Sequence, residues 1–405
     1  MNNVTLPVGI NSPNLQRIFE CIVESASKPL DKMTGLTSAA YTDWEFYNWE
    51  VENIFKKRWL CVGHISQIPN IGDYFNLDLL KEPLVVVRGS DREIRVLSRV
   101  CIHRGMDIMP SAGDRTTYGN RRSFICPYHH WTYSTNGQLL NAPEMQNRPE
   151  FDCSDYHLHE FRTEIWQGFI FMTFDSSIES VHDTYAGLLP YIERWQMSQL
   201  EMVVNLNWEC SFNWKVLVEN FMEAYHHLGT HHKTLEPIIP ASQAWTEAET
   251  PNHIVCHLPV NKSILNSEEK LEELLEFKHN PNLKSEDFQE YTIFLGEPNF
   301  LLAVRPDLVY WYFILPDGPN QITLHTTILV YPESSEDDDY QIKLDRNIEL
   351  LKEFHLEDME VCTAVQVGMS SQTYQPGPLS HLEMPICFFQ RYLARQIKQT
   401  IGKFS

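Results

Sequence analysis

Two glutamates and four histidines lie close together in the segment Asn213–His232, which reads NWKVLVENFMEAYHHLGTHH. Apolar residues recur there at helical spacing, which predicts an amphipathic helix over Lys215–Tyr225. Glu219, Glu223 and His226 are spaced i, i+4 and i+7, so this helix would place all three on one face. Carboxylates and imidazoles gathered in this way are candidate metal ligands.

The second pair of histidines follows a glycine, which predicts a break in the helix. Gly229 allows the chain to turn back, so that His231 can approach His226. Two histidines beside a carboxylate supply the ligand types of the facial triad that binds non-haem Fe(II). Histidines near a helix end also complement the helix dipole or face solvent, so this segment alone leaves both interpretations open. The adjacent His227 and His232 are the alternative ligands if the register is shifted.

A second group of metal-ligating residues lies upstream, as Cys101-x-His103 and Cys126-x-x-His129. Two thiolates suit one iron of a [2Fe–2S] cluster and two imidazoles suit the other, which is the Rieske arrangement. A Cys2His2 set also binds structural zinc. Zinc fingers, however, usually pair cysteine with cysteine and histidine with histidine, whereas each half here contains one of each. The spacing therefore favours the Rieske cluster.

The sequences around these residues resemble those of the oxygenase (alpha) subunits of Rieske non-haem iron oxygenases. CIHRG and CPYHHWTY are similar to the CxHRG and CPYHxW motifs of that family. The downstream half contains NWK…EN…YH…H, and LEDMEVCTAVQVGMSSQTYQPGPLS resembles the family's ED…VQxG…Y..G..S segment. The likeness covers nearly the whole chain. It implies a mononuclear non-haem iron held partly by His226 and His231, and a Rieske [2Fe–2S] cluster at Cys101, His103, Cys126 and His129.

The resemblance also indicates the third iron ligand. Asp358 matches the carboxylate position of the family's ED…VQxG segment. It shares its helix face with the apolar residues Val361, Cys362 and Val365. A carboxylate on a buried face needs a partner, and a metal ion is a suitable one. Asp345 and Glu357 are alternatives by spacing. We predict that the iron site consists of His226, His231 and Asp358.

Glu223 departs from most members of the family, which have an aspartate three residues before the first iron histidine. That acid is thought to link the iron histidine to a Rieske histidine of a neighbouring subunit. The longer glutamate offsets a segment between Asn220 and His226 that is one residue shorter than in the naphthalene-dioxygenase-like branch. Glutamate at this position resembles the branch acting on quaternary ammonium compounds such as glycine betaine, proline betaine and carnitine. We predict Glu223 as the electron-transfer bridge and Asn220 as a supporting residue.

Two further departures lie in the upstream half. His130 occupies a position that is commonly glycine in the family, and a positive φ there would strain its backbone. His129 keeps the Cys-x-x-His register and is the predicted ligand. The loop between His103 and Cys126 is longer than is usual in the family, and Asp114–Gly119 is the predicted insertion. A surface insertion of this kind costs little closure entropy.

Composition disfavours several classes of partner. The formal net charge is −22 and the pI is about 5.2, whereas nucleic-acid phosphates are neutralised by clustered Lys and Arg. The sequence has no run of 18 apolar residues and no basic-plus-apolar N-terminal signal. Its nine cysteines form no even disulfide framework. We expect a soluble cytoplasmic protein that binds neither membrane nor nucleic acid.

The helices and strands expected around these residues indicate an α+β protein. Short strands and turns from Trp59 onward indicate an all-β Rieske domain. The resemblance implies a helix-grip (START-like) catalytic domain, in which a curved antiparallel sheet holds a long C-terminal helix. The expected boundaries are 1–45 for an N-terminal helical leader, 46–175 for the Rieske domain and 176–405 for the catalytic domain.

Local signals predict several individual elements. Ser12-Pro13 should start a helix, and Thr42-x-x-Glu45 should cap the next one. The acidic run Glu336–Asp339 should begin a long helix. Hairpins are predicted over 84–100, 132–140 and 308–331, with a short strand at Ser123–Ile125 before the second of them. The other predicted elements are strands at Trp166–Phe174 and Met202–Ser211 and a helix at Ser267–Phe277.

Together these features predict the terminal oxygenase component of a multicomponent system. No glycine-rich nucleotide motif follows a predicted strand, so a separate flavin or iron–sulfur reductase, or a ferredoxin, must supply electrons from NAD(P)H. We expect a homotrimer that uses O2 to hydroxylate a small organic substrate. N-demethylation of a methylated amine and cis-dihydroxylation of an aromatic ring are both open. Hypotheses of other classes are a Rieske electron-transfer protein and an inactive binding module.

Overall fold

The structure is a computed structural model that describes residues 12–109, 118–267 and 274–402. Contacts within the chain divide the described residues into two compact units. The smaller unit is Lys57–Val181, and the larger unit combines the residues before Lys57 with His182 onward. The division therefore lies at 57 and 181, where the sequence predicted 46 and 175. The N-terminal helices belong to the larger unit and do not form a leader of their own.

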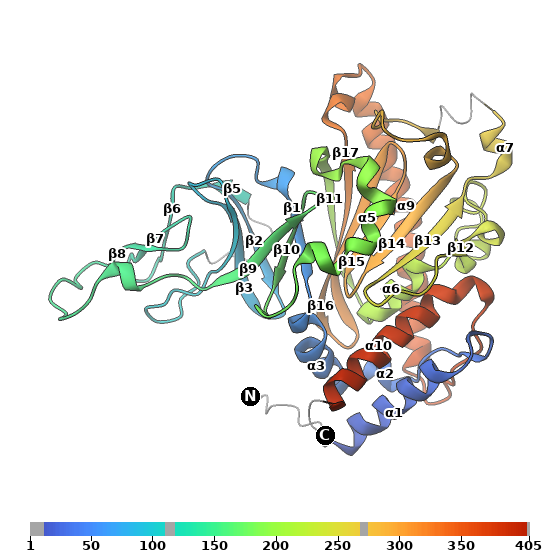
Figure 1. The fold of residues 1–405 in the computed structure, drawn as a ribbon, viewed down its shortest axis with the longest axis horizontal. Coiled ribbons are helices and arrows are strands. Elements are labelled where there is room, and N and C mark those ends of the chain that lie inside the picture. Colours follow the sequence, from blue (N-terminus) through green and yellow to red (C-terminus); the bar gives the residue numbers. More distant parts are fainter. Residues whose placement is uncertain (1–11, 110–117, 268–273, 403–405) are drawn as a thin grey trace. The chain divides into compact units, whose positions relative to one another are not determined.

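The smaller unit is built from antiparallel strands in two sheets (Figure 1). The larger sheet has seven strands in the order β1-β10-β9-β4-β3-β2-β5. These strands are β1 Leu60–His64, β2 Asp73–Leu79, β3 Glu82–Arg88, β4 Ile94–Ser98, β5 Tyr118–Asn120, β9 Glu160–Trp166 and β10 Phe169–Thr173. The smaller sheet has the order β6-β7-β8, with β6 Ser123–Ile125, β7 Thr132–Ser134 and β8 Leu139–Asn141.

Two predicted hairpins are confirmed here, and one predicted strand is wrong. β3 pairs with β4, and β7 pairs with both β6 and β8. Trp166–Phe174 is not one strand, because β9 ends at Trp166 and β10 begins at Phe169. Gln167 and Gly168 between them have φ of 52° and 85°, the pair of positive values that a two-residue type I′ hairpin requires. Most of the predicted insertion at Asp114–Gly119 lies outside the described residues.

The larger unit contains one seven-stranded antiparallel sheet in the order β11-β17-β16-β15-β14-β13-β12. Its strands are β11 Glu201–Cys210, β12 Trp245–Thr246, β13 His253–Pro259, β14 Glu290–Gly296, β15 Phe300–Val304, β16 Leu308–Gly318 and β17 Gln321–Val330. The predicted strand at Met202–Ser211 is confirmed as β11. The predicted hairpin over 308–331 is confirmed as β16–β17.

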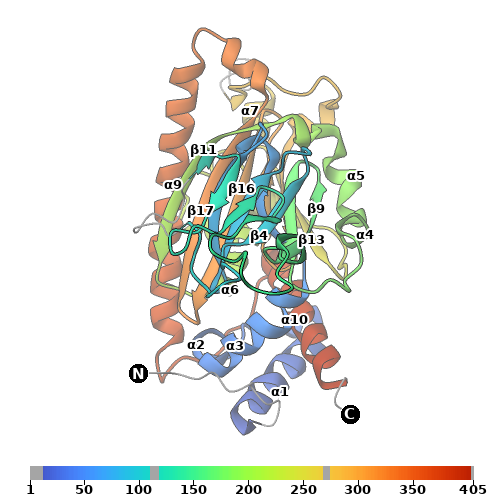
Figure 2. The same ribbon diagram turned by 90° about the vertical axis from the view of Figure 1, so that its left-hand side faces the viewer.

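Helices cover both faces of this sheet (Figures 1 and 2). The helix α9, Tyr340–Met369, lies on one face and α5, Leu189–Ile192, on the other. The remaining α-helices are α1 Pro13–Ser27, α2 Ala39–Thr42, α3 Trp44–Asn53, α4 Val181–Thr184, α6 Trp214–Met222, α7 Lys262–Leu265 and α10 Met384–Gly402. The predicted helix at Ser267–Phe277 falls largely on residues 268–273, outside the described residues. Among the described residues, no helix is both long and apolar enough to cross a bilayer.

The long helix predicted after the acidic run is α9, and its buried face differs in part from the prediction. Its buried residues are Leu344, Asn347, Leu351, Phe354, His355, Cys362 and Gln366. Asp358 and Cys362 lie on this face as predicted, with the Asp358 side chain 13% exposed. Val365 was assigned to the same face, but it is 38% exposed. The buried stripe continues through Gln366, because a 3.6-residue period moves it by four positions from Cys362.

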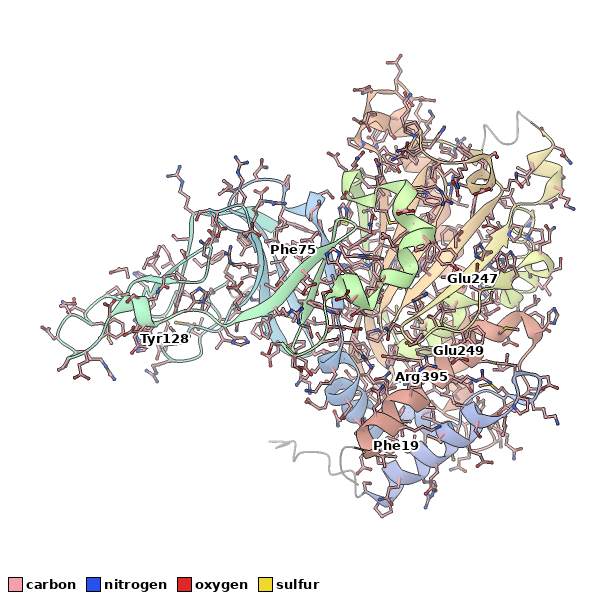
Figure 3. All side chains as sticks on the ribbon, in the orientation of Figure 1. Phe19, Phe75, Tyr128, Glu247, Glu249 and Arg395 are labelled. Carbon is pink, nitrogen blue, oxygen red and sulfur yellow. The ribbon has the colours of Figure 1, made fainter. Side chains whose placement is uncertain are left out.

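The N-terminal helix α1 packs on α10, and α2 and α3 pack against α1 (Figures 1 and 2). Ser12 caps α1, as predicted, and the buried α1 residues include Leu15, Ile18, Phe19 and Ile22. Phe19, which is labelled in Figure 3, lies edge-on to Trp49 of α3, with ring centroids 4.9 Å apart. The capping box predicted at Thr42 is wrong. Asp43 caps α3 by accepting the Phe46 N–H at 3.0 Å, because Thr42 is still part of α2.

The helix α6, which leads into the histidine segment, is fixed at its first turn. The Asn213 side chain accepts the Lys215 N–H at 3.0 Å, and the Asn213 N–H donates to Gln366 of α9 at 2.9 Å. Nζ of Lys215 lies 2.7 Å from Oε1 of Glu50 on α3, and both side chains are fully buried. A buried charge is tolerated only when it is paired in this way. These contacts set the position of α6 against α3 and α9.

Candidate metal centres and substrate cavity

The helix α6, which precedes the first predicted iron ligand, ends earlier than the apolar pattern of its sequence predicted. α6 ends at Met222, and Glu223 has extended backbone angles, with φ −124° and ψ 153°. His226 follows within a short 3-10 helix, Tyr225–Leu228. The helix predicted to reach Tyr225 is therefore wrong in its last turn. The Glu223 carboxylate accepts the His226 N–H at 3.1 Å and so begins a new turn.

The predicted return of the chain at Gly229 is confirmed. The Thr230 N–H donates to the carbonyl of His226 at 2.8 Å, and the rings of His226 and His231 have centroids 5.0 Å apart. Gly229 itself has φ −104°, an ordinary value for any residue. The turn therefore does not use the left-handed conformation that glycine favours.

Three ligand atoms converge where these histidines meet α9. Nε2 of His231 lies 2.9 Å from Oδ1 of Asp358, and Nε2 of His226 lies 3.6 Å from the same oxygen. The ligand atoms of the three residues all lie within 4.8 Å of one another. Burial raises the pKa of Asp358, but hydrogen bonding to His231 and the nearby His226 lower it further, so the carboxylate is held ionised. Two imidazoles and one carboxylate converging in this way fit the facial triad of non-haem iron.

A carboxylate holds the remaining nitrogen of each histidine. Nδ1 of His226 lies 2.8 Å from Oε1 of Glu223, and Nδ1 of His231 lies 2.7 Å from Oε2 of Glu357. The Thr234 hydroxyl donates to the same Glu357 oxygen at 2.8 Å. Metal-ligating histidines generally donate their second N–H to such a partner, which fixes the tautomer and the ring orientation. Both Nε2 atoms are thereby directed toward Asp358.

The residues considered as alternative iron ligands do not contribute atoms to this group of three. Nδ1 of His227 contacts the Ile239 carbonyl at 3.2 Å, and burial lowers the pKa of His227 to about 3. His232 is exposed and contacts the Gly229 carbonyl. Asp345 is exposed and accepts from Gln341 on its own helix. Glu357 contacts the outer nitrogen of His231, so it supports a ligand instead of replacing Asp358.

The two predicted Rieske loops share one pattern of backbone hydrogen bonds. In the first, the Cys101 N–H donates to the Met106 carbonyl and the Gly105 N–H to the Cys101 carbonyl, both at 2.8 Å. In the second, the Cys126 N–H donates to the Trp131 carbonyl at 2.9 Å and the His130 N–H to the Cys126 carbonyl at 3.0 Å.

The equivalence of the loops explains the conformation of His130. Gly105 has φ 75°, and His130, at the same place in the second loop, has φ 58°. His130 therefore has a positive φ, the condition under which the sequence predicts strain in its backbone. A residue with a Cβ is strained in this region of the Ramachandran plot, whereas glycine is not.

The loops bring the four predicted cluster ligands to one end of the smaller unit. Cys101 and Cys126 are buried, at 1% and 2% exposure, whereas His129 is exposed. The rings of His103 and His129 have centroids 4.6 Å apart. The Tyr133 hydroxyl lies 3.1 Å from Sγ of Cys101. Buried thiolates opposite accessible imidazoles suit a Rieske cluster, whose histidine-bound iron faces its redox partners.

Aromatic rings surround the imidazoles of this group. The indole of Trp131 stacks on His103 with an interplanar angle of 8° and a centroid separation of 4.7 Å. The ring centroid of Tyr128 lies 3.8 Å from that of His129, and Tyr128 is itself half exposed. Both contacts limit rotation of the predicted ligand rings.

A cavity of about 120 Å³ opens beside the triad. Asn220, Glu223 and the three triad residues line one end of it. Asn220 also hydrogen-bonds Asp358 and helps to hold that carboxylate ionised. Most of the wall is apolar or aromatic, and its aromatic residues are Phe221, Tyr291, Tyr310, Tyr312 and Phe354.

The aromatic run of β16 divides between the two faces of the sheet, as strand alternation requires. Tyr310 and Tyr312 line the cavity. Trp311 and Phe313 stack on each other with centroids 5.5 Å apart, and Phe313 packs near His325 of β17. Only half of the predicted aromatic set is therefore available to a ligand.

Two residues of this site were not assigned their roles from the sequence. Glu357 had been considered only as a rival ligand, although its position beside Asp358 was a signal. Arg305, which lines the cavity and is 5% exposed, had not been singled out. Its signal is the sequence LLAVRPDLVYWYF, in which one arginine and one aspartate interrupt an apolar run.

Comparison with known proteins decides the family. The profile described as "Ring hydroxylating alpha subunit (catalytic domain)" matches residues 191–399, and the Rieske [2Fe-2S] domain profile matches residues 58–161. The first match spans more than half of the chain. The chain belongs to the ring-hydroxylating oxygenase alpha-subunit family.

Named relatives of this oxygenase subunit have different substrates. It is 25% identical over 407 residues to the glycine betaine monooxygenase oxygenase subunit of Pseudomonas aeruginosa, covering 93% of this chain and 92% of that one. It is 35% identical over 208 residues to the biphenyl 2,3-dioxygenase alpha subunit of Rhodococcus jostii, covering 50% and 44%. The crystal structure of the quaternary ammonium Rieske monooxygenase CntA superposes with a TM-score of 0.78 at 23% identity, covering 92% and 98%. This last likeness shows a shared fold.

Family membership establishes the class of reaction and the cofactors. The protein is the oxygenase component of a Rieske system and an oxidoreductase that uses O2. Its cofactors are a Rieske [2Fe–2S] cluster and a mononuclear non-haem iron. Oxygenase subunits of this family form oligomers and receive electrons from a separate reductase or ferredoxin. The predicted fold, a Rieske domain with an antiparallel-sheet catalytic domain and a long helix, is confirmed.

Proposed function

We propose that His226, His231 and Asp358 hold the mononuclear iron and that the cluster is held by Cys101, His103, Cys126 and His129. The single observation that carries the first assignment is the convergence of the two Nε2 atoms on Oδ1 of Asp358. The equivalent hydrogen-bonded loops support the second. When bound, the cluster supplies electrons and the iron supplies the site of O2 activation.

Glu223 is the proposed bridge for electron transfer between the two centres. Its carboxylate contacts both the N–H and Nδ1 of His226. It also lines two cavities, the one beside the triad and a second one, whose other lining residues include Tyr225 and Val365. The proposed assembly is a homotrimer in which a histidine of a neighbouring copy enters the second cavity and meets this carboxylate, so that electrons cross between subunits.

The proposed reaction is oxidative N-demethylation of a quaternary or methylated amine. Glu223 in place of aspartate and the relatives acting on glycine betaine and quaternary ammonium compounds support this substrate class. The aromatic side chains Phe221, Tyr310 and Tyr312 in the cavity are suited to a cationic head group, because aromatic faces attract cations.

The reaction balances as a two-electron monooxygenation. One atom of O2 is inserted into a methyl C–H bond beside nitrogen, and the other leaves as water with two protons and two electrons from the reductase. The nitrogen–carbon bond of the hydroxymethyl product then breaks and releases formaldehyde. In this scheme the residues of the chain orient the methyl group and exclude water.

Cis-dihydroxylation of an aromatic ring is the second candidate. Its support is the apolar cavity wall and the likeness of half of the chain to a biphenyl dioxygenase alpha subunit. Such a reaction places both oxygen atoms on the ring and releases no formaldehyde. An electron-transfer protein or an inactive binding module would not need the convergent triad, so the two oxygenase reactions are preferred.

The test is substrate-triggered O2 uptake by protein reconstituted anaerobically with iron and sulfide and supplied with NADH and a reductase of this class. The panel consists of methylated amines and aromatic compounds, with formaldehyde assayed in parallel. Uptake matched by formaldehyde with a methylated amine is expected. Uptake only with aromatic compounds, without formaldehyde, would favour dihydroxylation and overturn the demethylation proposal.

A further inference from the structure

The cavity beside the triad extends to a second polar end. On the sheet, Tyr312 and Tyr310 mark successive inward positions of β16, and Arg305 lies beyond them after β15. Inward positions of a strand repeat about every 7 Å. On α9, Leu350 lines the cavity eight residues before Asp358, which corresponds to about 12 Å of helix. Both estimates separate the far end of the cavity from the triad by the length of a small molecule.

Arg305 is the cation of that far end. Among the described residues that line the cavity, it is the only lysine or arginine. Its Nε and Nη2 each lie 3.2 Å from an oxygen of Asp307, and Nη2 also donates to the Leu274 carbonyl. The Tyr291 ring lies 5.4 Å from the guanidinium carbon. The guanidinium is therefore held in place by a carboxylate, a carbonyl and an aromatic face.

Some N–H groups of the Arg305 guanidinium are left to donate hydrogen bonds to a ligand. Its three bonds to Asp307 and Leu274 use the Nε proton and the two protons on Nη2. Among the described residues, Nη1 has no carboxylate or carbonyl partner, and the guanidinium also hydrogen-bonds Tyr310, which lines the cavity. Burial lowers the pKa of Arg305, but Asp307 raises it further, so the guanidinium stays charged.

The end of the cavity beside the triad is rich in carboxylates. Asp358, Glu223 and Glu357 are three carboxylates that contact the iron ligands or belong to them. At the far end, Asp307 balances the charge of Arg305, so that end offers a carboxylate the N–H donors of the guanidinium, whereas the triad end offers a cation a group of carboxylates. A ligand with a cation at one end and an anion at the other would be oriented with its cation toward the triad.

We propose that Arg305, with the Tyr310 and Tyr291 hydroxyls, binds a carboxylate at the end of the substrate opposite its methylated nitrogen. The substrate is then a zwitterion, a methylated amine that also bears a carboxylate. This inference rests on the proposed demethylation and adds to it a residue that selects substrates. Binding in this orientation would place a methyl group of the ammonium end next to the triad.

The test compares substrates that differ only in the carboxylate. Anaerobic calorimetry on the iron-loaded oxygenase measures the Kd of γ-butyrobetaine and of its methyl ester, and the Kd of glycine betaine and of choline. Hydrogen bonds to a charged group predict that each carboxylate binds roughly 10- to 100-fold more tightly than its uncharged analogue. Binding is read without turnover, so the result does not depend on a reductase.

The matched variant is Arg305→Met combined with Asp307→Asn. The double change removes both charges together, because loss of Arg305 alone would leave Asp307 buried and unpaired. The asparagine side chain introduced by Asp307→Asn keeps an oxygen that can accept the Glu276 and Phe277 N–H groups, as Asp307 does at 2.9 and 3.3 Å. The expected result is that the preference for the carboxylate disappears, while the iron content and the Tm stay near those of the wild type.

The control is Arg346→Met, since Arg346 pairs with Glu276 at 2.8 Å, is 60% exposed and does not line the cavity. It should keep the full carboxylate preference. Equal affinity of the wild type for acid and ester would overturn the Arg305 inference and leave N-demethylation standing if formaldehyde is formed. Failure of every quaternary amine to bind or to yield formaldehyde would overturn both.

Discussion

Oε2 of Glu357 lies 2.7 Å from Nδ1 of His231, on the side of the ring opposite to the iron ligands. The next residue along α9, Asp358, contacts Nε2 of the same ring at 2.9 Å. Two adjacent carboxylates of one helix thus hold both nitrogens of one histidine. The register of α9 therefore sets the metal ligand and the orientation of its partner together.

This relationship predicts weaker iron binding in Glu357→Gln. The amide cannot accept the Nδ1 proton with the strength of a carboxylate, so His231 loses basicity and alignment. Loss of such a partner typically lowers metal affinity 10- to 100-fold. Iron retained after dialysis against graded chelator measures the effect. Asp345→Asn on the exposed side of the same helix is the control, and equal retention by both variants would contradict the role given to Glu357.

Glu223→Gln is expected to separate electron transfer from cofactor content. The cluster should be reduced by dithionite as in the wild type. The variant is compared at saturating iron, because loss of the carboxylate on Nδ1 of His226 should weaken iron binding as Glu357→Gln does. Reoxidation of the reduced cluster on mixing with O2 and substrate should slow roughly 10-fold or more, since His226 loses its charged partner. Stopped-flow absorbance measures this rate.

The control for that measurement is Glu219→Gln, one helical turn earlier. Glu219 contacts the Tyr41 hydroxyl at 2.8 and 3.0 Å and has no contact with His226 among the described interactions. Its substitution should leave the reoxidation rate unchanged. If Glu223→Gln reoxidises as fast as this control, the bridge is wrong.

Glu219 also predicts a dependence of stability on pH. Burial raises the pKa of Glu219 to about 7, against the opposing effects of Tyr41 and Lys215. A carboxyl whose pKa is higher in the folded state binds its proton more tightly there, so the free energy of unfolding falls as the pH rises from about 4.5 to 7. This loss amounts to at most about 3 kcal/mol.

Glu219→Gln removes the titrating group and should abolish that part of the pH dependence. Relative to the wild type, the variant should show its lowest stability at or below about pH 4, gain from pH 4.5 to 7, and be the more stable of the two above pH 7. Denaturant unfolding at a series of pH values provides the measurement. Parallel curves for variant and wild type would show that Glu219 does not titrate in this range.

The strained backbone of His130 predicts a stabilising substitution. His130→Gly removes the Cβ at φ 58° and should raise the free energy of unfolding by about 1 kcal/mol. Gly105→Ala, at φ 75° in the equivalent loop, should lower it by a similar amount. Loss of the cluster's visible absorbance on heating reports both changes. A shift of the same sign in both variants would contradict the equivalence of the loops.

The candidate ligands that the structure brings together could be proposed from the sequence, because the two histidines of the triad, and each Cys–His pair of the cluster, lie in short segments with their own spacing. It also predicted the strands around the cluster, since hairpins such as β3–β4 depend on local turn residues. The partner of His231 was not predicted, because Glu357 meets it only through the packing of α9 against the histidine segment.

The errors have local physical causes. α6 ends at Met222 in spite of an apolar pattern that continues, because Glu223 uses its carboxylate to cap the following turn. Asp43 displaced Thr42 as a cap, since two short helices meet there. Arg305 could not be recognised as a cavity residue until the strands were in register with each other.

The central claim is tested most directly by counting iron and acid-labile sulfide per chain in the wild type and in Asp358→Ala. Because a Rieske cluster holds two irons and the triad holds one, the wild type should contain three irons and two sulfides. Asp358→Ala should contain two irons and two sulfides, with the electron paramagnetic resonance signal of the reduced cluster unchanged. Three irons retained by Asp358→Ala, or only two in the wild type, would contradict the assignment of His226, His231 and Asp358 as the iron site.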